Sequence, residues 1–284
     1  MNDSPLTTIS VNGHETPVYL MGKPRVTLVS RPALAVSLSS PDDLAAMGIR
    51  KLKPATGNQA TDAELLCELG GRRCYESYSN PGAKTSREYL HHILSMKHGS
   101  VLEHAFFVFH VWRVSRGLSH ELVRHRAGTS FSQLSTRYVD HLHTPAVEPL
   151  ALLCPPTIWN NEVAREKWLQ ARRLDLETYA SNLDSLLPKQ EGKPDTAVVK
   201  AARQAARSGL PTASETRLQF GANIRSLIHI LDLRGSEGAD FEIRALAVEI
   251  LHIMQREAPI VFDSFRTTSL EDGSQAISVP WGKV

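Results

Sequence analysis

Apolar positions follow a helical period in several parts of the chain, first over residues 61–73 and 86–97. Glycine commonly ends a helix, so we expect the pair Gly70–Gly71 to end the first helix and Gly99 to end the second. In the second half of the chain the same period predicts helices over residues 161–187, 196–208, 223–233 and 242–256.

A different period marks the strands. His104 to Val114 is dense in aromatic and β-branched residues and is the strongest predicted strand, and Arg25 to Leu38 is a weaker one. We expect a short helix over Gly117–Arg126 and a polar loop over Gly128–Ser135. Residues 1–24 are expected to form an extended leader or a short strand pair. The pattern predicts an α/β (α+β) fold, with a single domain over residues 25–284 whose central sheet is flanked by helices, and an N-terminal extension over residues 1–24.

The 284 residues are 42% hydrophobic and 22% charged, which is typical of a globular protein with a substantial core. A net charge of +2 is too small to indicate a nucleic-acid partner. Cys67, Cys74 and Cys154 lack the spacing of a disulfide framework or a metal site, so we interpret them as structural. The polar N-terminus and the lack of a long apolar run predict a cytoplasmic protein without membrane association.

The segment Arg116–Arg137 concentrates candidate chemistry. It holds four arginines, two histidines and several hydroxyls, but Glu121 is its sole acidic residue. Arginine binds phosphate through two parallel hydrogen bonds, so the cluster predicts a phosphate-bearing ligand. A solvated helix face that pairs with a distant acidic patch explains the charges about equally well.

The order of residues in this segment favours a phosphate-bearing ligand over a solvated helix face. Arg124-His125-Arg126, a spacer and Ser135-Thr136-Arg137-Tyr138 resemble the signature of flavin-dependent thymidylate synthases. Further blocks resemble the same family in the same order, so the resemblance covers residues from about 60 to 266. These blocks are His98 to His104, Arg116 with Ser119 to Leu122, Ala206-Arg207 with Leu210-Pro211, and Asn223 to Leu227 with Leu233-Arg234.

The resemblance implies an enzyme that places a methyl group on C5 of a uracil nucleotide (UMP or dUMP). FAD is the implied cofactor, NADPH and 5,10-methylenetetrahydrofolate are the cosubstrates, and the assembly is a homotetramer with shared active sites. The positions that match FAD contacts are His98, Ser100, Arg124, His125, Arg126, Asn223 and Arg225. Those that match nucleotide contacts are Arg116, Glu121, Gln133, Ser135, Arg137, Arg207 and Arg234.

Several of these residues have a structural alternative. Ser100 and Asn223 are both suited to cap a helix, and His98 to be a cation at a helix C-terminus. Both roles can hold at once for Asn223. His104, His110 and His229 fit structural positions better than ligand positions, and no metal-binding spacing is present among the histidines.

For the reaction itself, Arg234 and Ser135 are the candidates. Ser135 has arginines rather than a histidine–carboxylate pair as expected neighbours, so it lacks the general base that a nucleophile needs. We therefore interpret Ser135 as a donor that positions the nucleotide. Arg234 is expected to stabilise negative charge that develops on the pyrimidine oxygens, while the flavin supplies the redox chemistry.

Two departures from the family pattern are present. The spacer Ala127–Leu134 has eight residues, one more than usual, as in the family's paralogue of polyoxin-type antibiotic biosynthesis. This favours use of both UMP and dUMP over strict dUMP use. Gly238 replaces a histidine that contacts the flavin, which predicts weak FAD binding. Rival interpretations are a nucleic-acid-binding module that uses Arg113–Arg137, and a flavin enzyme that oxidises NADPH without methyl transfer.

Overall fold

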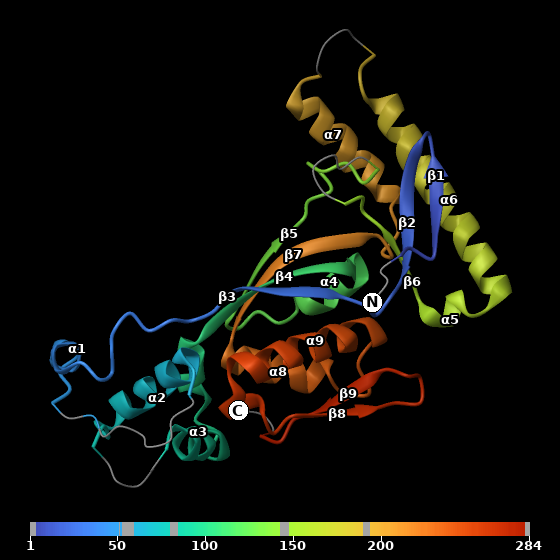
Figure 1. The fold of residues 1–284 in the computed structure, drawn as a ribbon. Helices are drawn as coiled ribbons and strands as arrows, with labels where there is room; N and C mark the ends of the chain where they lie inside the picture. Colours follow the sequence, from blue (N-terminus) through green and yellow to red (C-terminus); the bar gives the residue numbers. More distant parts are fainter. Residues whose placement is uncertain are drawn as a thin grey trace. The chain divides into compact units, whose positions relative to one another are not determined.

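The computed structural model describes residues 4–50, 52, 60–79, 85–142, 148–189 and 194–281 (Figure 1). The chain forms two compact units, each built from separate stretches of sequence. Unit 1 comprises residues 1–25, 111–123 and 132–218, and unit 2 comprises residues 26–110, 124–131 and 219–284.

Helices and strands alternate irregularly along the chain. The strands are β1 (Thr7–Val11), β2 (His14–Leu20), β3 (Arg25–Ser30), β4 (Phe106–Ser115), β5 (Thr129–Gln133), β6 (Leu152–Cys154), β7 (Glu215–Asn223), β8 (Arg266–Ser269) and β9 (Gln275–Ser278). The α-helices are α1 (Pro41–Ala46), α2 (Asp62–Cys74), α3 (Ser86–Ser95), α4 (Arg116–Leu122), α5 (Pro156–Trp159), α6 (Glu162–Leu186), α7 (Thr196–Ala206), α8 (Ile224–Arg234), α9 (Phe241–Glu257) and α10 (Pro259–Phe262). Short 3-10 helices cover Gly99–His104 and Arg207–Gly209.

In unit 1 the N-terminal extension is a β-hairpin, which agrees with the expected strand pair. β1 and β2 pair antiparallel, and β2 also pairs parallel with β6. The buried side chains of this three-stranded sheet pack with Trp168 and Leu176 of α6. This burial explains why an extension with little periodicity is ordered.

A four-stranded sheet has the order β3-β4-β7-β5. The predicted strand from Arg25 ends at Ser30, before Pro32, whose nitrogen cannot donate to a sheet. The predicted loop Gly128–Ser135 is wrong over Thr129–Gln133, which forms β5 beside β7. Pairing with a strand that lies far along the sequence outweighs the polar character of this segment, which faces solvent at every second residue.

The expectation that Gly70–Gly71 ends a helix is also wrong, because α2 continues to Cys74. A Cβ atom at Gly70 would lie 2.8 Å from His104, and one at Gly71 would lie 2.4 Å from the hydroxyl of Tyr89. The two glycines therefore allow close packing within unit 2 and do not terminate the helix.

The helices of the second half are close to their predicted bounds. Asn161 and Asn223 each accept a backbone hydrogen bond as the N-cap of α6 and α8. The predicted helix over Gly117–Arg126 ends earlier, at Leu122, so Arg124, His125 and Arg126 follow the helix in a turn and the segment after it. No described helix has the length and apolar character needed to cross a membrane.

Candidate active site

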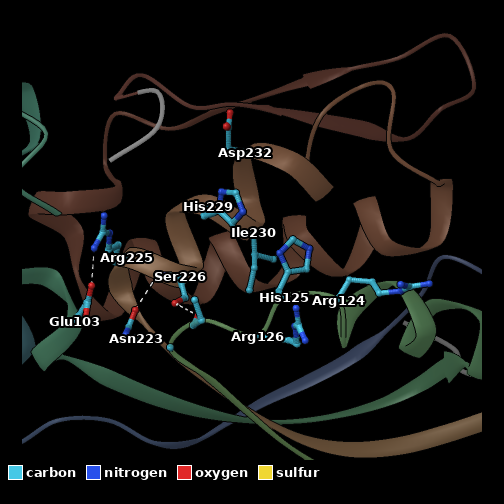
Figure 2. Close-up of a pocket in the computed structure, with 12 residues that line it drawn as sticks. Glu103, Arg124, His125, Arg126, Asn223, Arg225, Ser226, His229, Ile230 and Asp232 are labelled. Atoms are coloured by element: carbon cyan, nitrogen blue, oxygen red, sulfur yellow. Dashed lines mark hydrogen bonds and ion pairs between the residues drawn. The ribbon is translucent and has the colours of Figure 1, made fainter. Parts of the chain in front are cut away.

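Unit 2 contains a pocket of about 930 Å³ along α8 (Figure 2). Three parts of the chain supply its walls: the 3-10 helix before β4, the segment between α4 and β5, and α8 with its cap. The lining residues are Glu103, Arg124, His125, Arg126, Ala127, Gly128, Asn223, Arg225, Ser226, His229, Ile230 and Asp232. Five of the seven positions that match FAD contacts are among them.

Gly128 lies at a crowded corner of this pocket. The side-chain oxygen of Asn223 accepts a hydrogen bond from the backbone N–H of Ser226 at 2.9 Å, and the Ser226 hydroxyl donates to the carbonyl of Ala127 at 2.6 Å. The backbone N–H of Asn223 donates to the carbonyl of Gly128 at 3.1 Å. Gly128 itself has φ +65, and a Cβ there would lie 2.4 Å from both Asn223 Nδ2 and Ser226 Oγ. Asn223 thus caps α8 and lines the pocket, as the sequence allowed.

Replacing Gly128 by alanine is expected to lower the free energy of unfolding by about 1–3 kcal/mol, from the left-handed backbone and the displaced cap together. Gly273→Ala is a matched control, because Gly273 has φ +77 but no atom lies within 4 Å of its added Cβ. Chemical denaturation of both variants measures the difference. Equal losses would contradict the role of crowding at Gly128.

The pocket carries positive charge, and the carboxylate of Glu103 in its wall is a counter-charge. Arg124 and Arg126 are exposed, and Arg225 pairs with Glu103 at 2.6 Å. His125 is 9% exposed, and its Nε2 accepts a hydrogen bond from Nε of Arg234 at 3.0 Å. Burial, followed by the charges of Arg234 and His229, lowers the pKa of His125 to about 4. The pocket therefore offers guanidinium groups and a neutral imidazole, a donor set that suits a phosphate-bearing cofactor.

The other two positions matched to FAD, His98 and Ser100, are exposed and line a second pocket of about 320 Å³. Arg225 lines both pockets, so all seven positions form one continuous set within unit 2. His98 makes no capping hydrogen bond, and Ser100 lies inside the 3-10 helix rather than at its cap. The backbone N–H of His98 donates to the carbonyl of Ile93 at 3.0 Å, so His98 lies just beyond the C-terminus of α3, and its alternative as a cation at that helix end remains open.

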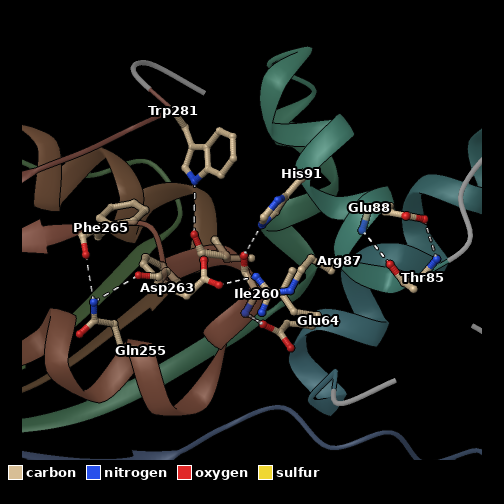
Figure 3. Close-up of polar contacts among 12 residues, drawn as sticks. Glu64, Thr85, Arg87, Glu88, His91, Gln255, Ile260, Asp263, Phe265 and Trp281 are labelled. Atoms are coloured by element: carbon tan, nitrogen blue, oxygen red, sulfur yellow. Dashed lines mark hydrogen bonds and ion pairs between the residues drawn. The ribbon is translucent and has the colours of Figure 1, made fainter. Parts of the chain in front are cut away.

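The end of α2 contributes to the wall of the second pocket through its last residue, Cys74, and its C-cap, Tyr75. Near the start of α2, Glu64 Oε1 accepts a hydrogen bond from the backbone N–H of Ile260 at 2.6 Å (Figure 3). His91 of α3 contacts the carbonyl of the same residue at 3.0 Å. Burial raises the pKa of Glu64, against the lowering effect of its backbone hydrogen bonds. These contacts attach α2 and α3 to α10 and so fix the wall.

Six of the seven positions matched to the nucleotide lie in unit 1, and Arg234 lies in unit 2. Burial, followed by the charge of Arg207, lowers the pKa of Arg116. Arg207 donates to the hydroxyl of Thr136 at 3.2 Å. Within the described part of unit 1, Arg116 Nη1 and Arg137 Nε are buried and lack hydrogen-bond partners. Buried guanidinium donors without partners are costly unless an anion binds them.

The neutral members of this set have more local partners. The Gln133 amide donates to the hydroxyls of Ser119 at 2.9 Å and Thr216 at 3.0 Å, which leaves its carbonyl oxygen for other contacts. Ser135 Oγ lies 3.4 Å from the backbone N–H of Arg137 and accepts from it. Glu121 is half-buried at the end of α4.

The cysteines have the environment of structural residues. Cys67 and Cys154 are fully buried, and Cys74 is exposed. Burial raises the pKa of the Cys67 thiol to about 12 and that of Cys154 to about 11. Thiols with raised pKa values are poor nucleophiles at neutral pH.

Some pocket residues escaped the sequence analysis. His229, which the sequence analysis assigns to a structural rather than a ligand position, is exposed, lines the pocket and contacts the ring of His125. Ser226 and Ile230 follow Asn223 on α8 by three and seven residues, the spacing of one helix face. This spacing was the available signal. Glu103 belongs to a block that resembles the family but was matched to no ligand.

The comparisons with known proteins identify the family. Residues 58–260 match the family model of the thymidylate synthase complementing protein. A flavin-dependent thymidylate synthase from Mycobacterium marinum is 40% identical over 235 residues, which is 81% of this chain and 91% of the relative. The chain belongs to the flavin-dependent thymidylate synthase family.

Further relatives agree with this assignment. The flavin-dependent thymidylate synthase of Corynebacterium aurimucosum is 40% identical over 225 residues, 78% of this chain and 88% of the relative. A solved structure of the UMP/dUMP methylase PolB from Streptomyces cacaoi, bound with 5-Br UMP, covers 87% of this chain and 94% of its own with a TM-score of 0.60. Its identity of 18% supports likeness of fold. The chain is thus an enzyme of the flavin-dependent thymidylate synthase type, a family that uses FAD with NADPH and methylenetetrahydrofolate.

The resemblance implies a flavin-contacting histidine at the position of Gly238, a residue that lines neither of the two pockets. It is exposed in the loop between α8 and α9, and an added Cβ would meet no atom within 4 Å. Gly238→His therefore fits without steric strain. Because the resemblance implies that a histidine here contacts the flavin, we expect the variant to bind FAD more strongly by about 1–3 kcal/mol, the usual gain from aromatic stacking. Flavin fluorescence titration of the apoenzyme measures it, with Gly238→Ala as control. An unchanged dissociation constant for Gly238→His would contradict the expectation, as would a wild-type enzyme that keeps stoichiometric FAD through gel filtration at low concentration.

Proposed function

We propose that this enzyme methylates C5 of a uracil nucleotide, UMP as well as dUMP, with methylenetetrahydrofolate as the carbon donor and NADPH as the reductant of FAD. The observation that carries the proposal is the separation of two cationic sets. One set lines the pocket in unit 2, and the other, in unit 1, includes Arg116 and Arg137, each with a buried guanidinium nitrogen that has no hydrogen-bond partner among the described residues. Two phosphate-bearing ligands, a dinucleotide and a mononucleotide, account for two such sets.

Each set has a distinct task in this proposal. Arg124, His125, Arg126, Asn223 and Arg225, with His98 and Ser100, hold FAD, which supplies the reducing chemistry when it is bound. Arg116, Arg137 and Arg207 hold the nucleotide phosphate, while Glu121, Gln133 and Ser135 orient its sugar and base. Arg234 stabilises the negative charge that develops on the pyrimidine oxygens during methylation. No described group of histidine, cysteine and acidic residues is arranged to hold a metal ion.

The proposal includes a homotetramer, in which neighbouring subunits complete each active site. Six nucleotide positions lie in unit 1 and seven FAD positions in unit 2, so sharing between subunits is one way to bring both ligands together. Sedimentation equilibrium tests the assembly. A monomer that is fully active would overturn this part of the proposal.

The proposed use of UMP rests on the eight-residue spacer Ala127–Leu134. Its first residues, Ala127 and Gly128, line the pocket, and the rest continues into β5, whose last residue is the nucleotide position Gln133 and which ends two residues before Ser135. An extra residue here shifts the connection between the two cationic sets at little cost in stability. A strict dUMP enzyme for DNA precursor supply is the alternative, and it is favoured by the names of the 40% identical relatives.

The deciding experiment is anaerobic reoxidation of the reduced flavin with methylenetetrahydrofolate and either UMP or dUMP, followed by product analysis. We expect both nucleotides to yield a C5-methylated product, with kcat/KM values within about a hundredfold. A preference for dUMP of several hundredfold would assign the enzyme to strict thymidylate synthesis. Flavin reoxidation without a methylated product from either nucleotide would reject the proposed function, in favour of a flavin enzyme that oxidises NADPH alone.

A further inference from the structure

One hydrogen bond joins the pocket in unit 2 to Arg234. Nε of Arg234 lies 3.0 Å from Nε2 of His125. An arginine side chain is always protonated and has donors but no acceptor. The imidazole nitrogen must therefore accept, which requires a neutral His125 with its hydrogen on Nδ1.

The surroundings of His125 favour this neutral form. The ring of His229 from α8 stands edge-on to it, with centroids 5.7 Å apart. Arg124 and Arg126 flank it in sequence, Arg234 faces it from the end of α8, and the acidic Asp232 lines the same pocket. Burial and the neighbouring cations together oppose protonation, in agreement with the direction of its pKa.

The two partners belong to different tasks. His125 lines the pocket matched to FAD, whereas Arg234 matches a nucleotide position and does not line that pocket. We infer that His125 is a positioning residue, whose neutral imidazole orients the guanidinium of Arg234 and thereby couples the flavin pocket to recognition of the pyrimidine. This inference rests on the proposed function for the identity of the two ligands, but the hydrogen bond and the tautomer do not depend on it.

The consequence is specific to the acceptor atom. Glutamine at position 125 can present an oxygen close to the place of Nε2, so His125→Gln retains an acceptor for Arg234. His125→Leu places an apolar side chain in the same space and removes the hydrogen-bond acceptor for Arg234. We expect His125→Leu to weaken dUMP binding to the FAD-saturated enzyme by at least tenfold, while His125→Gln changes it by less than about threefold.

A double-mutant cycle separates positioning from general damage. Arg234→Lys keeps the positive charge but loses the Nε–H donor. If His125 acts through Arg234, His125→Leu has little further effect on dUMP binding in the Arg234→Lys background. Calorimetry with dUMP at saturating FAD gives the four dissociation constants. Additive effects would overturn the inference, as would a His125→Leu enzyme that loses FAD affinity while its dUMP affinity at saturating FAD stays unchanged.

A spectroscopic readout tests the same idea without activity. In enzyme labelled with ¹⁵N-histidine, the ring nitrogens of His125 are expected to show the Nδ1–H tautomer at pH 7, with assignment by comparison with His125→Gln. An Nε2–H tautomer or a doubly protonated ring would overturn the inference. If the Nδ1–H tautomer and the non-additive mutant cycle are both observed but no methylated product forms, the proposed function is rejected. The coupling between His125 and Arg234 is then still supported.

Discussion

Turnover is expected to fall by at least a hundredfold when Arg234 is replaced by alanine. Arg234 is the last residue of α8, and its guanidinium donates a hydrogen bond to His125. The position of its positive charge is therefore set before the substrate binds. Preorganised donors of this kind contribute about 10²–10³ in rate because no reorganisation is needed during the reaction. The measurement is kcat for the FAD-loaded variant at saturating nucleotide, which separates loss of the chemical step from loss of binding.

Cys67→Ala and Cys154→Ala are the matched controls for this prediction. Both thiols are fully buried with raised pKa values, so neither is available as a nucleophile. Each control is expected to retain turnover within about threefold, with some loss of stability from the cavity that is left behind. A folded Cys variant without activity would show that covalent catalysis by a thiol operates and that Arg234 has a secondary part. Retained turnover in Arg234→Ala would also reject its proposed role.

The second large effect concerns stability in acid. His141 is 1% exposed in unit 1, and within the described residues both of its ring nitrogens lack hydrogen-bond partners. Burial lowers its pKa from 6.5 to about 4, with a smaller lowering from Arg116 and an opposing effect of Asp140. Above pH 6.5 the imidazole is neutral in both folded and unfolded chains. Between pH 6.5 and 4 the unfolded chain binds a proton that the folded protein excludes, so stability falls by about 3 kcal/mol.

Urea denaturation from pH 7 to pH 4 measures this loss, and His141→Gln is the control. Glutamine has no charge over the range, so the variant is expected to lose less stability than the wild type as the pH falls, even if it is less stable at pH 7. His125, whose pKa is lowered in the same direction, contributes equally to both proteins and cancels in the difference. Parallel pH profiles for wild type and variant would show that His141 is protonated without cost in the folded state.

Local signals in the sequence located much of the fold. Asn161 and Asn223 were placed at the starts of long amphipathic helices, and both cap them. Helix α9 begins and ends one residue outside its predicted bounds. These features depend on side chains within a few residues of one another, so periodicity and capping chemistry suffice to find them.

The site was predictable as a list of residues rather than as an arrangement. The motif Arg124-His125-Arg126 and the cap Asn223 are 97 residues apart or more, yet both line one pocket. His229 was missed because its helical position alone does not distinguish an exposed pocket wall from packing. The ion pair between Arg225 and Glu103 was also missed, because it joins residues that are 122 positions apart in the sequence.

The amino-acid sequence by itself determined the mixed helix and strand pattern, the capping of α8 by Asn223, the clustered guanidinium groups and the resemblance that named the family. Tertiary structure alone decided that Gly70 and Gly71 lie inside a helix, that a polar spacer becomes β5, and that His125 accepts from Arg234. Each of these depends on a partner distant in the chain, whose atoms either fill the space beside a glycine or supply the missing half of a hydrogen bond. Packing and strand pairing with residues far away in the sequence outweigh local secondary-structure propensity. The residues around a position do not specify which distant residue will pack or pair with it.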